Sequence, residues 1–145
     1  MPDDAFAQAF TEVTAGGRHF GHREHVHLTW LAVRRCGMPA AIGVVSDGIR
    51  RTARYAGAPQ KYHATVSRAW VEVVAHHACA TPTEEFAEFA RVNSELFDKR
   101  LLTRFYSSAL LAAPAARAGW VLPDRKPFPF SPLPADPSPP TSPRR

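Results

Sequence analysis

Cysteine, lysine and long apolar runs are all scarce in this chain of 145 residues. The two cysteines, Cys36 and Cys79, lie far apart without Cys-x-x-Cys spacing, which predicts reduced thiols and excludes a zinc finger. No apolar run approaches the roughly 20 residues that a membrane-spanning helix requires. The acidic start of the chain also lacks the basic and apolar regions of a signal peptide. We therefore expect a cytoplasmic protein without a membrane partner.

Basic charge is present, but it is not concentrated in one segment. The net charge of +5 comes from fifteen arginines, three lysines and thirteen acidic residues. The arginines occur as short pairs, from Arg34-Arg35 to Arg144-Arg145, with acidic residues between them. This spread favours a solvated, arginine-rich surface over the clustered footprint that neutralises phosphates. We do not expect a nucleic-acid partner.

Proline divides the chain near residue 122. Of the fourteen prolines, nine lie between Pro123 and Pro143. Proline has no backbone N–H and a fixed φ, so residues 123–145 are predicted to form an extended, disordered tail. Pro-x-x-Pro spacing in this tail is a weak signal of a docking peptide. Residues 1–122 are long enough for one domain with its own core.

Amphipathic helix patterns fill residues 1–122, and no strand alternation is present. Caps, glycines and prolines mark the ends of the expected helices. The expected elements are a helix capped by Asp4, helices over 22–37, 39–57 and 60–79, a helix opening at the capping box of residues 81–84, one or two helices within 96–112, and a short turn after Pro114. The pattern predicts an all-α fold, a single compact bundle of about five to seven helices.

Four of the seven histidines lie within residues 18–27. On a helix that begins near His22, the side chains of His22 and His25 lie one turn apart on the face that also carries Trp30. His27 falls on a neighbouring face. His22 and His25 are therefore predicted to continue the apolar stripe of this helix toward its N-terminus.

A second stripe brings His63 into the same prediction. His63 begins the apolar face of the fourth helix, which continues through Trp70. Short connections favour antiparallel neighbours, so the second and fourth helices are expected to run in the same direction. His22, His25 and His63 are then expected to converge at one end of the bundle.

Three imidazoles at one end of the bundle are compatible with two kinds of chemistry. They could bind a divalent metal ion such as zinc, iron or manganese and leave one coordination position open. Two histidines and Glu24 could instead form a facial triad, although Glu24 is better placed to orient a histidine or to complement the helix dipole. Without a metal, His25 and His63 could act as an acid–base pair, with Tyr62 or Tyr106 as a further proton donor.

The leading hypothesis is a small enzyme, metal-dependent or using histidine acid–base chemistry, that acts on a small organic molecule. His22, His25, His63 and Glu24 are its predicted catalytic residues, and the three histidines are its predicted metal ligands. The structural alternative is a polar cluster with satisfied ring nitrogens. The functional alternative is a non-catalytic interaction or scaffold protein that uses the proline-rich tail. The remaining histidines are predicted to lie at the surface or to pack.

The same residues carry a resemblance to a known family. Phe20-Gly21-His22-Arg23-Glu24-His25 and the later Lys61-Tyr62-His63 resemble the F-x-H-x-[DE]-H and K-Y-H motifs of a family of small, all-helical, uncharacterised bacterial proteins. The similarity spans roughly residues 6–124 and includes Asn93 and the segments 104–107 and 117–124. It implies that one site is formed by His22, Glu24, His25 and His63. It implies no particular activity.

Overall fold

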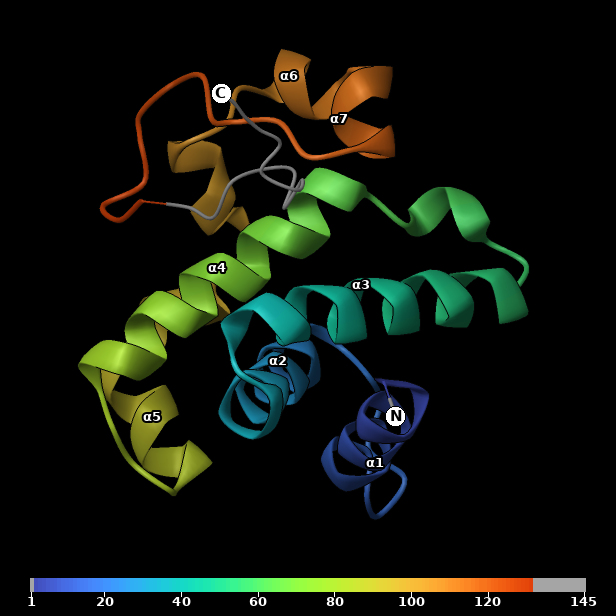
Figure 1. Cartoon of the computed structure of the whole chain (residues 1–145), viewed down its shortest axis with the longest axis vertical. Coiled ribbons are helices and arrows are strands. Elements are labelled where there is room, and N and C mark those ends of the chain that lie inside the picture. The colour runs from blue at the N-terminus through green and yellow to red at the C-terminus, as the bar shows by residue number, and fades with distance from the viewer. Residues whose placement is uncertain (1, 132–145) are drawn as a thin grey trace, which may run out of the picture.

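The computed structural model describes residues 2–131, which are helical over most of their length (Figure 1). Seven α-helices and three short 3-10 helices make up this part of the chain. They are α1 (Pro2–Val13), α2 (His22–Cys36), α3 (Met38–Tyr55), η1 (Pro59–Lys61), α4 (Ala64–Ala80), α5 (Phe86–Val92), η2 (Ser94–Phe97), η3 (Lys99–Arg104), α6 (Ser108–Ala112) and α7 (Pro114–Ala118). The predicted all-α fold is confirmed.

Helices α2, α3 and α4 pack against one another and form the centre of the fold (Figure 1). Helix α1 covers α2 and α3, while α7 lies against α4. The fully buried core includes Val26 and Leu28 of α2, Val45 of α3, and Val71 and Val74 of α4. Val26 and Leu28 cannot share one narrow face of a helix, so α2 is covered on several sides.

A close approach of α1 to α3 depends on glycine. Gly48 of α3 lies directly against the Phe6 ring, and a Cβ at this position would overlap the ring atoms. Phe6 is itself buried. The two helices can therefore pack at this distance only because residue 48 has no side chain.

Three predicted helix starts differ from the structure. Helix α1 already includes residues 2–4, so Asp4 is not the residue before it. Helix α4 begins at Ala64, and residues 59–61 form η1 instead of its first turn. The capping box predicted at residues 81–84 is wrong, because α5 begins at Phe86. There the Thr83 hydroxyl oxygen accepts a hydrogen bond from the N–H of Glu85, which makes a local turn instead of a helix start.

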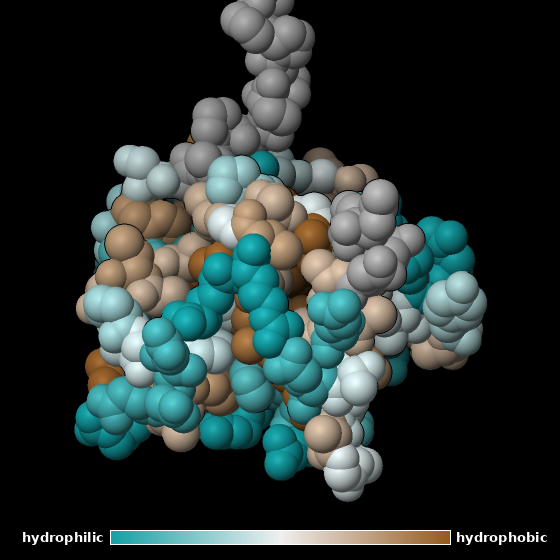
Figure 2. All heavy atoms as spheres, turned by 60° about the horizontal axis from the view of Figure 1, so that its bottom comes forward, coloured by the Kyte–Doolittle hydropathy of each residue, from teal (hydrophilic) through white to brown (hydrophobic). Residues whose placement is uncertain are grey.

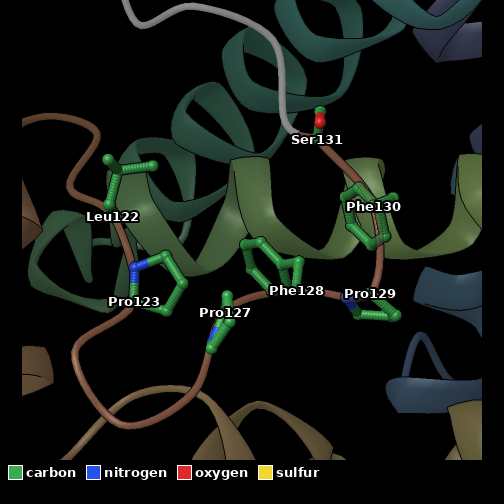
Figure 3. A pocket seen from close by; sticks show the side chains of 7 residues that line it. All are labelled: Leu122, Pro123, Pro127, Phe128, Pro129, Phe130 and Ser131. Carbon is green, nitrogen blue, oxygen red and sulfur yellow. The ribbon is translucent and has the colours of Figure 1, made fainter.

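The segment 123–131, assigned from the sequence to the tail, is packed against the helices. Figure 3 shows it crossing α4 with the rings of Phe128 and Phe130 turned toward that helix. Phe128 is buried, and the N–H of Arg125 donates to the carbonyl of Phe105 at 2.8 Å. Asp124 accepts hydrogen bonds from the N–H and the hydroxyl of Ser107. The packed domain thus continues to Ser131, and the rest of the predicted tail, residues 132–145, lies outside the described residues.

The surface has mixed polarity. Figure 2 shows polar side chains spread over one face of the molecule, with apolar ones between them. None of the helices within residues 2–131 is both long and apolar enough to cross a membrane. Both cysteines, Cys36 and Cys79, carry free thiols, as predicted.

Candidate functional site

The structure brings His22 and His25 together at the start of α2. Their ring centroids lie 6.4 Å apart. The Trp70 ring of α4 meets His22 edge-on at 4.8 Å, and the Phe20 ring meets His25 in the same way at 6.3 Å. The helix begins at this point because Gly21 has an extended backbone and Glu24, in the first turn, caps it. The two imidazoles therefore lie side by side between aromatic walls.

A backbone carbonyl determines the tautomer of His22. Nε2 of His22 lies 2.8 Å from the carbonyl oxygen of Leu96 in η2. Since a carbonyl oxygen can only accept a hydrogen bond, Nε2 carries the proton and Nδ1 carries the lone pair of the neutral ring. Burial is the main reason that the pKa of His22 is lowered. At neutral pH the ring therefore offers Nδ1 as a base or a ligand.

The imidazole of His25 has no hydrogen-bond partner within residues 2–131. Atoms surround its ring on most sides, although a part of the residue remains accessible to solvent. Burial, followed by the neighbouring charge of protonated His22, lowers the pKa of His25 to about 4. His25 is thus neutral at physiological pH, and about one molecule in a thousand would carry the proton at pH 7.

Glu24 points back to the start of its own helix. Its Oε1 atom accepts a hydrogen bond from the N–H of Gly21 at 3.0 Å. Partial burial acts to raise the pKa of Glu24, but this hydrogen bond and the nearby Arg18 and Arg23 outweigh it and lower the pKa. The carboxylate therefore caps α2 and complements its dipole, one of the two roles predicted for it.

His63 lies apart from the other two predicted histidines. It is the N-cap of α4, and its Nδ1 atom accepts a hydrogen bond from the N–H of Val66 at 3.1 Å. Its Nε2 atom donates to the carbonyl of Leu111 at 2.7 Å. Both ring nitrogens are engaged, so a role in metal binding or proton transfer would require one of these hydrogen bonds to break.

The separation follows from an offset between the two helices. His22 packs against Trp70, which lies about two helical turns, or roughly 10 Å, beyond His63 along α4. Within residues 2–131, no three or more histidine, cysteine, aspartate or glutamate side chains are grouped so that they could hold a metal ion. The predicted zinc, iron or manganese ion stays a prediction.

No known protein family, curated protein or solved structure matches the chain. The resemblance to a bacterial family, with its motifs around His22 and His63, therefore stays a prediction as well.

Tyr106, predicted as an additional proton donor, is tied to the backbone. Its hydroxyl donates to the carbonyl oxygen of Val121 at 2.8 Å, and the side chain is fully buried. Burial and then the charge of Glu72 raise its pKa above the usual value. Tyr106 therefore keeps its proton and anchors the segment that follows α7.

A second histidine cluster, which the sequence interpretation assigned to surface or packing roles, lines a cavity of about 520 Å³. His77 lies near the end of α4, and its Nδ1 atom is 2.9 Å from Oδ1 of Asn93. Its Nε2 atom is 3.9 Å from a carboxylate oxygen of Glu95. The signal that could have indicated this group was Asn93, a polar residue at the position where the apolar stripe of residues 86–90 would continue; it is buried and is the C-cap of α5.

Proposed function

We propose that the chain is a small helical enzyme in which His22 takes up and returns a proton of a small organic molecule, while His25 holds that molecule by a hydrogen bond. One observation carries the proposal, namely two neighbouring neutral imidazoles, of which one has a lone pair on a defined nitrogen and the other has no partner. Buried polar atoms of side chains in a structural role normally have a hydrogen-bond partner. His63 in this chain has that satisfied arrangement, whereas His22 and His25 do not.

The two histidines would have different tasks. His22 would accept the proton on Nδ1, because Leu96 holds its Nε2–H in place, as the orienting partner of a catalytic histidine does. His25, whose pKa of about 4 makes it a weak base, would stay neutral and hold the substrate by a hydrogen bond. Since a charge on one ring disfavours a charge on the other, the pair would carry at most one positive charge at a time.

A metal-dependent form of the reaction would need further ligands. His22 and His25 together offer two imidazoles, whereas a catalytic zinc site usually has three protein ligands. Glu24 and His63 are both engaged in hydrogen bonds elsewhere. Proton transfer is therefore assigned to the imidazoles themselves, and the metal-dependent form becomes a separate outcome of the experiment.

The experiment compares the wild type with His22→Gln, His25→Gln and His19→Gln. Two reactions that need proton transfer are followed, namely hydrolysis of a panel of small esters and exchange of α-protons of small keto acids in D2O by NMR. Loss of the base in His22→Gln is expected to lower the rate by at least about 100-fold. His25→Gln, which changes the group that holds the substrate, is expected to lower it as well. His19 is exposed, so His19→Gln is the matched control and should keep the wild-type rate.

Two results would contradict the proposal or change it. A wild-type rate no higher than that of the double variant His22→Gln/His25→Gln on every substrate would contradict it. Elemental analysis of untagged protein tests the metal. About one equivalent of zinc, iron or manganese, lost in His25→Gln, would replace the metal-free mechanism by a metal-dependent one.

A further inference from the structure

The cavity beside His77 is separate from the His22–His25 pair and has the features of a ligand site. It lies between α4, η3 and the segment 126–130, and its volume of about 520 Å³ is within the usual range for small-molecule pockets. Neither His22 nor His25 lines it. We propose that this cavity binds a small organic carboxylate with an aromatic or apolar body.

The charges around the cavity favour an anion. Two cationic side chains, Arg104 and Lys126, and one carboxylate, Glu95, line it. Neither cation makes a side-chain hydrogen bond or ion pair with another part of residues 2–131. Burial, and then the proximity of His77, lower the pKa of His76, which reduces the positive charge that this side chain contributes. Two cations against one carboxylate leave a net positive charge that suits one carboxylate group.

Aromatic side chains make up the walls. Phe105 and Phe128 are buried and lie with their ring centroids 5.0 Å apart. Phe130 stacks on Phe128 at 5.0 Å and on His76 at 4.8 Å. Figure 3 shows Phe128 and Phe130 extending from the same segment toward α4. An aromatic ring of a ligand would find both stacking and edge contacts here, in addition to burial of apolar surface.

His77 supplies a hydrogen-bond acceptor of defined orientation. The amide nitrogen of Asn93 donates to Thr81 Oγ1 and to the carbonyl of Phe89, which identifies Oδ1 as the acceptor atom of this side chain. Oδ1 therefore accepts from Nδ1–H of His77, which places the lone pair of the neutral ring on Nε2. Nε2 lies 3.9 Å from Glu95, beyond hydrogen-bond distance, so this atom is available to a hydroxyl or N–H group of the ligand.

Three matched probes test the charge of the ligand on the full chain. They are 3-phenylpropanoate, 3-phenylpropan-1-ol and 3-phenylpropylammonium, which share one aromatic body and differ in charge. Binding is followed by shifts of the backbone amide signals of the cavity residues in NMR spectra. The carboxylate is expected to bind at about 1 mM, the alcohol about fivefold more weakly, and the ammonium ion more weakly still.

Two variants test the assigned residues with opposite expected signs, and a third is their control. Arg104→Gln should weaken binding of the carboxylate about fivefold, and Glu95→Gln should strengthen it severalfold. Arg54→Gln removes the same charge from the exposed surface of α3, away from the cavity, and should leave the affinity unchanged. All three positions are exposed, so the fold is expected to persist.

The proposal is overturned if the carboxylate fails to bind at about 10 mM, or if the alcohol binds as tightly. It is also overturned if Arg54→Gln weakens binding as much as Arg104→Gln, because the effect would then be that of overall charge. His25→Gln should not change the affinity of the probe. The result is therefore independent of any enzymatic role of the His22–His25 pair.

Discussion

The buried imidazole of His25 should make the fold sensitive to acid. Its pKa falls from the ordinary value of 6.5 to about 4 on folding, first through burial and then through the proximity of His22. Between these two values the unfolded chain binds a proton that the native state does not, so stability decreases as the pH falls. The stability that depends on the neutral His25 ring is fully present above about pH 6.5 and is lost as the pH falls toward 4. At about 1.4 kcal/mol for each pKa unit, the loss is about 3 kcal/mol.

Urea unfolding at several pH values, followed by circular dichroism, measures this loss. Between about pH 7 and about pH 4 the wild type should lose about 3 kcal/mol more than His25→Gln, which has no titrating group at this position. The difference between the two curves removes the contributions of the other histidines and of the carboxylates. His19→Gln, a change at an exposed histidine, should follow the wild type. Parallel curves for wild type and His25→Gln, or an NMR titration of His25 with a pKa above 6, would refute the reasoning.

Three further predictions concern the fold, and unfolding in urea measures each of them. Gly48→Ala should destabilise the protein by about 1–3 kcal/mol because the new methyl group would overlap Phe6, and an unchanged stability would show that α1 can move aside. Phe128→Ala should cost about 3 kcal/mol, since this side chain is buried; a cost below about 0.5 kcal/mol would mean that the segment 123–131 does not belong to the packed domain. His63→Ala should cost about 1–2 kcal/mol through loss of the α4 cap and of the hydrogen bond to Leu111, and a neutral result would contradict the capping role.

The N-terminal half of the fold follows closely from local signals. Helix α2 begins at His22 and ends at Cys36, next to Gly37, whose φ of +82° is one that glycine adopts readily. Trp30 and Trp70, both expected in the core, are buried. These elements are long and strongly periodic, so the apolar pattern and the glycine stops predict their presence, while the starts of α1 and α4 differ from the prediction.

The region after residue 96 could not be predicted in the same way. One or two amphipathic helices were expected over 96–112, but the structure has η2, η3 and the short α6 there. Asp98 accepts a hydrogen bond from the N–H of Arg100, and Ser107 accepts one from the N–H of Leu110. Each side chain starts a new short helix and so interrupts a longer one. The spacing of Leu101, Leu102 and Phe105 fits these turns as well as it fits an α-helix, so periodicity could not separate the two cases.

The common direction of α2 and α4 was not enough to predict where His63 lies relative to His22 and His25. The proximity of His22 and His25 follows from their spacing on one helix, and the two rings are close together in the structure. The position of His63 depends on how far α2 and α4 are shifted along each other, which packing of Trp70 against His22 sets. Local sequence patterns carry no information on such a shift, since it arises from side chains that interlock across two helices.

The short helix η2 contacts both histidine sites. The carbonyl of Leu96 holds Nε2–H of His22, and the next residue toward the N-terminus, Glu95, faces His77. Leu96 contacts His22 through its backbone carbonyl and Glu95 faces His77 with its side chain, so neighbouring residues of η2 can serve two different sites. The Leu96 side chain is fully buried and fixes η2 in the core. The tautomer of His22 and the distance from Glu95 to His77 thus depend on one packing contact, because a shift of Leu96 would move the carbonyl and the carboxylate together.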